Sequence, residues 1–141
     1  MDKIYIPKRF KGSIGYHIFV DRYCRAGPNP SYIEGRRMKS WSDSMPDWQP
    51  DQDGVYRNEY YYGGNLQGII QKLDYISELS VDLLYLSPIS KTNTNHHYDV
   101  GDQREIDPYI GTWNDFTVLC YEAHKRKMLV AIDLVFNHMG A

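Results

Sequence analysis

The sequence predicts an α/β fold in which parallel strands alternate with helices. Three short apolar segments are typical of buried strands, and two amphipathic segments between them are typical of helices. Along the 141 residues the order is strand, long loop, helix, strand, loop, helix, strand. This alternation favours a parallel sheet with right-handed crossovers, because parallel neighbours need a connection long enough to return. Two architectures satisfy it, an open doubly wound sheet and a (β/α) barrel.

The first predicted strand covers residues 14–20, with the sequence IGYHIFV, and ends at Asp21 and Arg22. A polar stretch follows from about residue 24 to residue 62 and contains four of the seven prolines. Loops of this length in compact domains are usually functional or disordered. We therefore expect a long insert after the first strand.

The first predicted helix covers residues 65–79, where apolar residues recur on one helical face and Asn65 is placed as the N-cap. The preceding Gly63-Gly64 pair is typical of a tight turn and lacks the spacing of a nucleotide-binding loop. The second strand covers residues 81–89 and is followed by a polar loop to about Gly111.

The second predicted helix begins after Gly111, and Thr112 and Asp115 are spaced as a capping box. Its apolar face is formed by Phe116, Leu119, Cys120 and Ala123. The third strand covers residues 128–136, with the sequence MLVAIDLVF. The carboxyl ends of all three strands are followed by polar residues, among them Asp21, Arg22, Asn137 and His138, and both architectures place their sites at those ends. We therefore expect these side chains to face one rim of the sheet.

Composition narrows the function classes. A net charge of -2 lacks the basic excess expected of a nucleic-acid binder. No apolar run approaches the roughly 20 residues needed to cross a bilayer, and the N-terminus shows no signal region. We therefore expect no nucleic-acid or membrane partner and a cytoplasmic location, while secretion of a longer gene product stays open. Cys24 and Cys120 are expected to be free thiols.

Individual polar residues carry weaker predictions. Asp133 lies in an apolar strand, where a carboxylate must be paired or hydrogen-bonded, so functional and structural roles are both open. His96 and His97 are adjacent in a loop, which favours exposure to solvent. The segment DQDG at 51–54 begins like a calcium loop, but it lacks the later Glu that such a loop requires.

Four ordered blocks of sequence resemble the alpha-amylase superfamily, glycoside hydrolase family thirteen. They are YHIFVDRY at 16–23, GGNLQGIIQKLDYISELSVDLLYLSPI at 63–89, NHHYDVGDQREIDPYIGTWNDF at 95–116 and DLVFNH at 133–138. The resemblance spans about residues 14–140 and is strongest to neopullulanases, cyclomaltodextrinases and maltogenic amylases. It implies that the chain is one partial catalytic domain over residues 1–141, the first three β/α units of a (β/α)8 TIM barrel with an insert at about 24–62.

The resemblance also implies site residues. Tyr98 would stack on a glucose ring, which agrees with an aromatic side chain at a strand end. His96, Asp99 and His138 would hydrogen-bond sugar hydroxyls, and Asp133 would support the site from beneath. His97 stands where the family commonly has Gly, and we expect it to add bulk beside the sugar.

Calcium is the cofactor to consider for a full-length relative. Asn137 is the candidate metal ligand, because its counterpart binds structural calcium in many family members. Relatives with a calcium loop after the first strand have acidic residues where this chain has CRAGPNPS, and Asn65 stands where Asp is frequent. We therefore assign no metal site from the sequence.

The function implied is that of an N-terminal fragment of a retaining hydrolase of α-glucans or maltooligosaccharides. Retaining glycosidases need two carboxylates about 5 Å apart, and in this family they follow the fourth and fifth strands. The chain ends after the third, so we expect no catalytic residue within it and no activity alone. The alternative is a non-catalytic carbohydrate-binding or structural remnant. Unpaired strands also predict self-association.

Overall fold

A three-stranded parallel sheet is the centre of the computed structural model, which describes residues 7–28, 30–43, 49–50, 52–55, 58–138 and 140. The strands are β1 (Gly15–Ile18), β4 (Leu83–Leu86) and β7 (Leu129–Ile132), in the order β1-β4-β7. His17 pairs with Tyr85, and Tyr85 pairs with Ala131. The predicted parallel sheet is thus confirmed, with each strand beside the next one in sequence.

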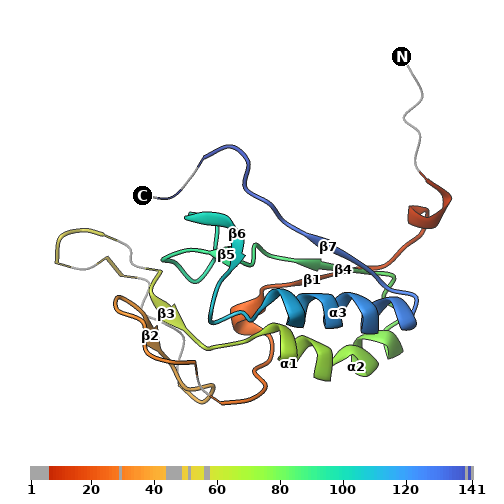
Figure 1. Ribbon diagram of the computed structural model, residues 1–141, viewed down its shortest axis with the longest axis horizontal. Coiled ribbons are helices and arrows are strands. Elements are labelled where there is room, and N and C mark those ends of the chain that lie inside the picture. The colour runs from red at the N-terminus through yellow and green to blue at the C-terminus, as the bar shows by residue number, and fades with distance from the viewer. Residues whose placement is uncertain are drawn as a thin grey trace.

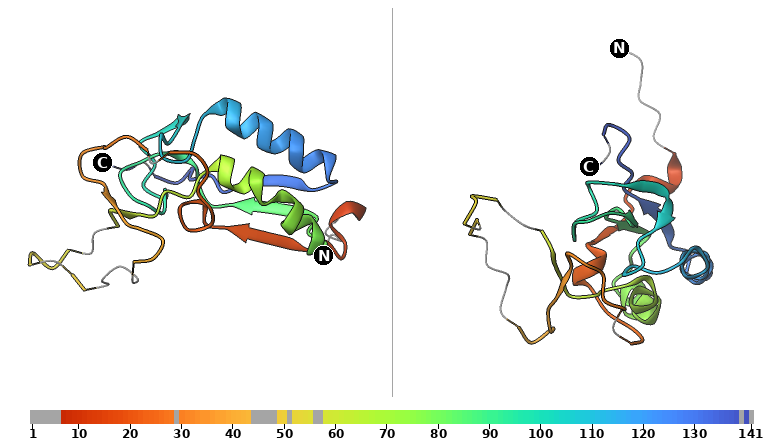
Figure 2. Two further views of the ribbon diagram at one scale, coloured as in Figure 1. Left: turned by 90° about the horizontal axis from the view of Figure 1, so that it is seen from below. Right: turned by 60° about the vertical axis from the view of Figure 1, so that its left-hand side comes forward.

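Helices cover one face of this sheet (Figures 1 and 2). They are α1 (Leu66–Gln71), α2 (Leu73–Glu78) and α3 (Trp113–Lys125). The single helix expected at 65–79 is interrupted at Lys72, whose amide bonds to the carbonyl of Ile69 in a tighter turn. Both predicted caps are confirmed, because Asn65 accepts from Gly68 N and Thr112 forms a capping box with Asp115.

The core lies between the helices and the sheet. Alternate residues of β4, Leu84 and Leu86, are fully buried against it. The helices contribute completely buried side chains to the same cluster, namely Leu66, Ile69, Leu73, Ile76, Leu119 and Ala123. Each large aliphatic side chain among them contributes about 1.5–3 kcal/mol by leaving water. Tyr85 lies between Leu84 and Leu86, so its side chain belongs to the opposite, uncovered face.

The strands are shorter than their apolar runs. Residues 14–20, 81–89 and 128–136 were expected to be extended, but pairing stops at Ile18, Leu86 and Ile132. The last ladder contact is Asp133 N to Leu86 O at 2.9 Å. After β1 the chain forms a short 3-10 helix, η2 (Val20–Arg22). Beyond these residues the three segments separate and form loops. We call the loops at the carboxyl ends of β1, β4 and β7 the rim.

The rim contains strands that were not predicted. In the insert, β2 (Arg37–Met38) pairs in parallel with β3 (Tyr60–Tyr61). After β4, the strand β5 (Ser90–Lys91) pairs antiparallel with β6 (Asp102–Ile106). Figure 1 shows both pairs, with the C-terminal segment, beyond one end of the central sheet. A further 3-10 helix, η1 (Lys8–Phe10), precedes β1. Two-residue strands such as β2 and β3 are too short for alternation to reveal.

The Gly63-Gly64 segment packs the chain before α1 closely against η2. Gly63 has φ +76°, and a Cβ on Gly64 would lie 2.0 Å from the carbonyl oxygen of Val20. Gly63 thus has a left-handed backbone, as is typical of turns, but residues 62–65 form no regular turn. Cys24 and Cys120 are free thiols, as expected. Within the described ranges, none of the helices has the length and apolar character needed to cross a bilayer.

Candidate functional site

A hydrogen bond between Tyr98 and Asp133 joins two segments of the rim. The Tyr98 hydroxyl donates to Asp133 Oδ2 at 2.8 Å across 35 residues of sequence. Asp133 directly follows β7 and is half-buried, whereas Tyr98 is 39% exposed. The bond to Asp133 raises the pKa of Tyr98 to about 12, with burial as a smaller cause. Asp133 thus has the partner that a carboxylate in an apolar strand requires.

Two histidines converge on the backbone of Tyr98. His96 Nδ1 accepts from Tyr98 N at 3.0 Å, so in the neutral ring the proton is on Nε2. Burial lowers the pKa of His96, which favours that neutral ring. His138 Nε2 lies 3.1 Å from Tyr98 O, and because a carbonyl only accepts, the imidazole is the donor. The structure therefore brings together His96, Tyr98, Asp133 and His138.

Asp99 is held by two threonine hydroxyls. Thr92 Oγ1 and Thr94 Oγ1 both donate to its Oδ1. Burial raises the pKa of Asp99, but the two hydroxyls outweigh it, and the net pKa lies below that of an ordinary aspartate. Asp99 is consequently ionised at neutral pH. It follows Tyr98 in sequence, so the same loop positions both side chains.

The predictions for His97 were wrong. Its side chain is 2% exposed, with Nδ1 bonded to Asn95 O at 3.0 Å and Nε2 3.6 Å from Asp107 Oδ2. The backbone has φ +63°, in the left-handed region that glycine adopts most easily. This conformation turns the chain between His96 and Tyr98, so the two imidazoles face different ways. His97 fills the protein interior and adds no bulk on the solvent side.

A buried ion pair between Arg36 and Asp107 was missed by sequence reasoning. Arg36 donates to both carboxylate oxygens of Asp107 at 2.7 and 2.6 Å, and its guanidinium lies 4.9 and 4.6 Å from the ring centres of Tyr61 and Tyr109. Burial alone would raise the pKa of Asp107, but the neighbouring His97 and Arg36 hold it well below its usual range. Asp107 lies in a motif quoted above, but the polar insert gave no signal for Arg36.

Tyr85 and His17 were also missed. Their rings lie 5.0 Å apart on the sheet face opposite α1, α2 and α3. Partial desolvation and then the carboxylate of Asp133 raise the pKa of Tyr85. Alternation in β4 was the available signal, because Leu84 and Leu86 face the helices and Tyr85 must face away. These two rings extend the site from the rim down the open face.

Asp21 does not face the rim, contrary to expectation. It is 2% exposed and accepts hydrogen bonds from Tyr62 N, Gly63 N and Arg22 Nε. Burial is the main cause that raises its pKa, and the three donors oppose it. Arg22 in turn covers the Tyr62 ring at 4.5 Å. Asp21 therefore fixes the segment before α1, because two of its donors are the backbone amides of Tyr62 and Gly63.

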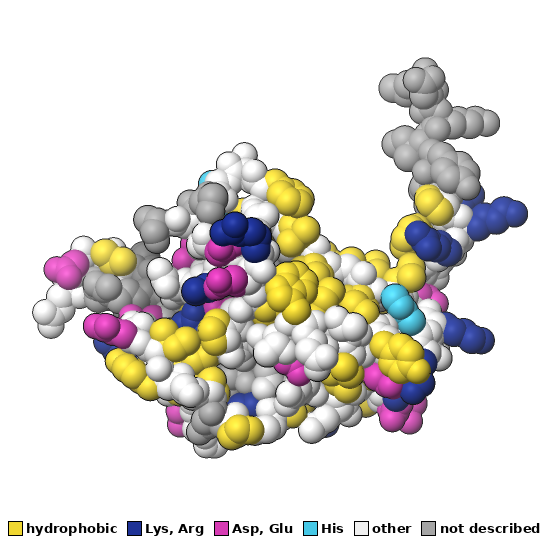
Figure 3. All heavy atoms as spheres, in the orientation of Figure 1, with side chains coloured by type: hydrophobic (Ala, Val, Ile, Leu, Met, Phe, Trp, Pro, Cys, Tyr) yellow, Lys and Arg dark blue, Asp and Glu magenta, His cyan; other side chains and the backbone are white. Residues whose placement is uncertain are grey.

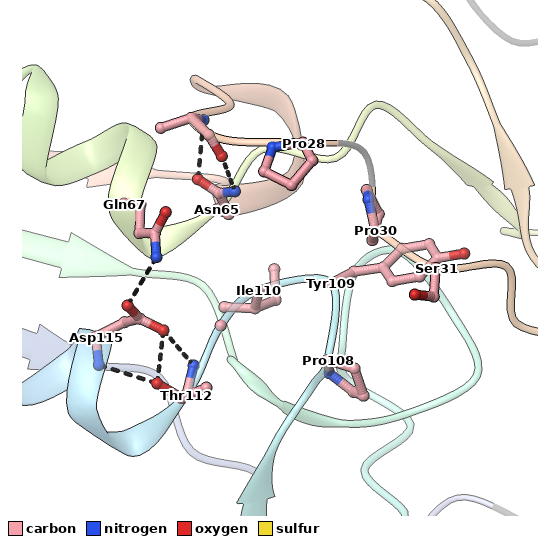
Figure 4. Close-up of a pocket in the computed structure, with 12 residues that line it drawn as sticks. Pro28, Pro30, Ser31, Asn65, Gln67, Pro108, Tyr109, Ile110, Thr112 and Asp115 are labelled. Carbon is pink, nitrogen blue, oxygen red and sulfur yellow. Dashed lines mark hydrogen bonds between the residues drawn. The ribbon is translucent and has the colours of Figure 1, made fainter.

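Among the described residues of the loop after β1 and the start of α1, the hydrogen bonds of Asn65 do not fit a calcium ligand. Calcium prefers six to eight oxygen ligands. Here the Asn65 amide donates to Ala26 O at 2.8 Å, and its oxygen accepts from Ala26 N at 3.1 Å (Figure 4). The same oxygen also accepts from Gly68 N at 2.8 Å. The side-chain N–H of Asn65 thus points at the Ala26 carbonyl, whereas a cation bound between the two residues would need an oxygen in that place. The adjoining cavity, about 420 Å³, is lined by prolines, Gln67 and the capping residues of α3.

No metal site is assigned elsewhere. Asn137 is exposed, and across the ranges that the structure describes no group of three or more His, Cys, Asp or Glu side chains could hold a metal ion. Asp51 of the DQDG segment lies outside the described residues. Asn137 alone supplies one amide oxygen, which is too few for calcium.

Known proteins match this chain over almost its entire length. The model of the family "Alpha amylase, catalytic domain" matches residues 3–141. An intracellular maltogenic amylase of Bacillus subtilis is 36% identical over 140 residues, covering 99% of this chain. A cyclomaltodextrinase of Geobacillus thermopakistaniensis is 34% identical over 140 residues, again covering 99%.

Solved structures agree with the sequence matches. A cyclic alpha-maltosyl-(1→6)-maltose hydrolase from Arthrobacter globiformis, in complex with that cyclic sugar, superposes with a TM-score of 0.79 at 32% identity. The match covers 96% of this chain and 28% of that one. The chain spans 22% of the length of the two curated relatives named above. In the homologues this fold is a TIM barrel. Since the family model matches residues 3–141, the chain belongs to the alpha-amylase catalytic-domain family.

Proposed function

We propose that this chain is the N-terminal part of a retaining α-glucan-active glycoside hydrolase of the maltogenic amylase or cyclomaltodextrinase type. We further propose that His96, Tyr98, Asp99 and His138 bind one glucose unit of the substrate. The observation that carries this proposal is the 2.8 Å bond from Tyr98 to Asp133. It fixes a partly exposed aromatic ring at the carboxyl end of the sheet, where barrel enzymes have their sites.

The chemistry around Tyr98 suits a neutral sugar. An exposed ring face packs against the apolar face of a pyranose. Sugar hydroxyls both donate and accept, and the site offers both kinds of group. His96 presents Nε2–H as a donor, and the ionised Asp99 is an acceptor. Asp133 is the positioning group beneath, because its carboxylate is bonded to the phenol of Tyr98.

We propose that residues 1–141 contribute the first three β/α units of the barrel and do not hydrolyse glucans alone. Retention requires a nucleophile and an acid/base carboxylate roughly 5 Å apart. Asp99 is bonded to Thr92 and Thr94, and Asp133 is bonded to Tyr98. These two carboxylates have supporting partners, which favours binding and positioning roles for them.

The sugar site can be tested by NMR titration of residues 1–141 with maltotriose. We expect chemical-shift changes at Tyr98 and Asp99 and their loss in Tyr98→Ala. Tyr75→Ala is the matched control, because Tyr75 is 54% exposed on α2, away from the rim. Equal effects of the two substitutions, or no changes at Tyr98 in the unmodified chain, would contradict the sugar site.

The absence of hydrolysis is tested separately with a chromogenic α-glucoside. We expect no release of the chromophore by residues 1–141. Turnover that disappears in His138→Ala would show that the chain is catalytic by itself. Turnover that persists in this variant would point to a contaminating enzyme, and repeated purification would decide.

A second candidate is a non-catalytic carbohydrate-binding or structural remnant of the same fold. The engaged carboxylates at the rim are compatible with it, because binding needs no free acid/base pair. The sequence of the gene after Ala141 discriminates the two functions. Acidic residues at the ends of a fourth, fifth and seventh strand would support the hydrolase, and their absence would support the remnant.

We also propose that residues 1–141 self-associate and act inside the cell. Within the described structure, β1 and β7 each pair on one side only. Trp113 at the start of α3 is 53% exposed, and Leu134 and Phe136 after β7 are 46% and 80% exposed. Figure 3 shows hydrophobic side chains over α3 and along the C-terminal segment. Light scattering at low concentration should give an oligomer, and a monomer would refute this. The name of the Bacillus subtilis relative supports the location.

A further inference from the structure

We propose that Arg36, in the insert after β1, is a positioning residue for the sugar site, because it holds Thr92 and Thr92 orients the carboxylate of Asp99. This proposal rests on the proposed function of Asp99. Arg36 itself touches neither Tyr98 nor Asp99. Its effect is transmitted through two contacts, from guanidinium to Thr92 and from Thr92 to Asp99.

The first contact is made by a guanidinium that is fixed on all sides. Its side chain is 4% exposed, and that of its partner Asp107 is 0% exposed. Two bonds to Asp107 use the Nη1 and Nη2 groups, and Nη2 also donates to Thr92 O at 2.5 Å. The rings of Tyr61 and Tyr109 lie against it and meet each other edge-on at 5.2 Å. The planar guanidinium is therefore held in one orientation, in which Nη2 is directed at Thr92 O.

The second contact passes from Thr92 to Asp99. Thr92 Oγ1 donates to Asp99 Oδ1 and also lies 3.1 Å from Asp99 O. Thr92 N faces Asp107 Oδ2 at 3.4 Å, so the backbone of Thr92 is held on both its donor and its acceptor. These bonds fix the backbone of Thr92 and hence the position of its Cβ, and in the observed rotamer the hydroxyl is directed to Asp99.

The insert braces the same loop at a second point. Asn95 N bonds to Asn58 O at 2.8 Å, and Asn95 Nδ2 bonds to Tyr60 O at 2.9 Å. Both contacts join the insert to the loop that carries His96, Tyr98 and Asp99. The insert thus lies against the back of the sugar site. Arg36 is a buried charged residue through which the insert contacts this loop. Its geometry is maintained because a buried charge that loses its partner destabilises the fold strongly.

The test measures the pKa of Asp99 by carbon-detected NMR in residues 1–141. Arg36→Lys keeps a cation between the two rings but cannot donate to Asp107 and Thr92 through one rigid fork. We expect the depressed pKa of Asp99 to rise toward that of an ordinary aspartate, and the affinity for maltotriose to fall about tenfold, as for one charge-assisted hydrogen bond. Arg36→Met should give the same direction with a larger shift.

Two further variants make the test specific. Arg37→Lys is the matched control, because Arg37 is the adjacent arginine but is 64% exposed and pairs with Glu59. It should leave the Asp99 titration unchanged. Thr92→Val removes the donor itself and should raise the pKa of Asp99 directly. Adding Arg36→Lys to Thr92→Val should then produce no further rise, because both act through one hydroxyl.

The outcomes separate the two proposals. If the unmodified chain does not bind maltotriose, the sugar site fails, and the Asp99 titration still decides the role of Arg36. An unchanged Asp99 pKa in folded Arg36→Lys would overturn the positioning role. Loss of the native near-ultraviolet circular dichroism in both Arg36 variants would also overturn it, because Arg36 would then determine the fold and not the orientation of Asp99.

Discussion

Asn65→Asp tests how the loop after β1 is attached to α1. In the native chain the Asn65 amide donates to Ala26 O at 2.8 Å, and its oxygen accepts from Ala26 N and Gly68 N. Aspartate keeps the two accepting contacts but replaces the donor with a second oxygen. The new carboxylate oxygen would face the carbonyl of Ala26. The substitution therefore isolates one hydrogen bond, because aspartate is as good an N-cap as asparagine.

The magnitude follows from two opposing terms. Losing the donor and leaving Ala26 O against an oxygen costs about 1–3 kcal/mol. A negative charge at the first turn of a helix returns about 0.3–1 kcal/mol, and less for a short helix such as α1. The net loss in the free energy of unfolding is about 1–2 kcal/mol. For a chain of this size the melting temperature should fall by roughly 3–8 °C.

Thermal unfolding followed by circular dichroism measures this loss. Asn93→Asp is the control, because it makes the same charge change at an exposed loop position. The native chain should melt at the same temperature with millimolar calcium or with a chelator, since the amide already joins loop and helix. An Asn65→Asp variant as stable as the native chain, or a native chain that the chelator destabilises, would refute this account.

Three further predictions concern Gly64, the buried ion pair and the rim. Gly64→Ala should lower the free energy of unfolding, measured in urea, by about 3 kcal/mol, because its Cβ would lie 2.0 Å from Val20 O. Gly101→Ala is the control, because its Cβ would meet only Lys91 O, at 3.6 Å. The pKa of Asp107 is depressed by folding, so the stability it contributes is present above about pH 4 and is lost as the pH falls toward the folded value. Asp107→Asn should weaken the loss of stability in this acidic range. An unchanged dependence of stability on pH there would argue against this role of Asp107. Tyr98→Phe should lower the ultraviolet absorbance change near pH 12, to which Tyr23 also contributes, and should cost about 1 kcal/mol of stability, while an unchanged absorbance change would refute the assignment to Tyr98.

Much of the framework could be predicted from local sequence. Helical periodicity identified α1, α2 and α3, and the caps at Asn65 and Thr112 were correct because each cap bonds to a residue three positions away. Strand ends were overestimated because an apolar run continues past the last paired residue, as at Leu134 and Val135 after Asp133. The break at Lys72 was missed because the apolar face continues through it.

For the candidate site, too, part could be predicted from the sequence and part could not. Its residues could be named because the rim follows the ends of buried strands, and because the motifs around Tyr98 and His138 resemble a known family. The orientation of the side chains could not be deduced. His97 and Asp21 were expected to face outward and are 2% exposed each. Their partners come from other segments, and no local pattern encodes those contacts.

The sequence by itself determined the order of strands and helices, the caps and the positions at the strand ends, since these depend on residues a few places apart. Only the tertiary structure decided that Arg36 meets Asp107 across 71 residues, that Tyr98 meets Asp133 across 35, and that one of two adjacent histidines turns inward. The physical reason is that hydrophobic periodicity specifies which face of an element is buried. The pairing of polar groups between distant loops is specified only when the packed core brings those loops together.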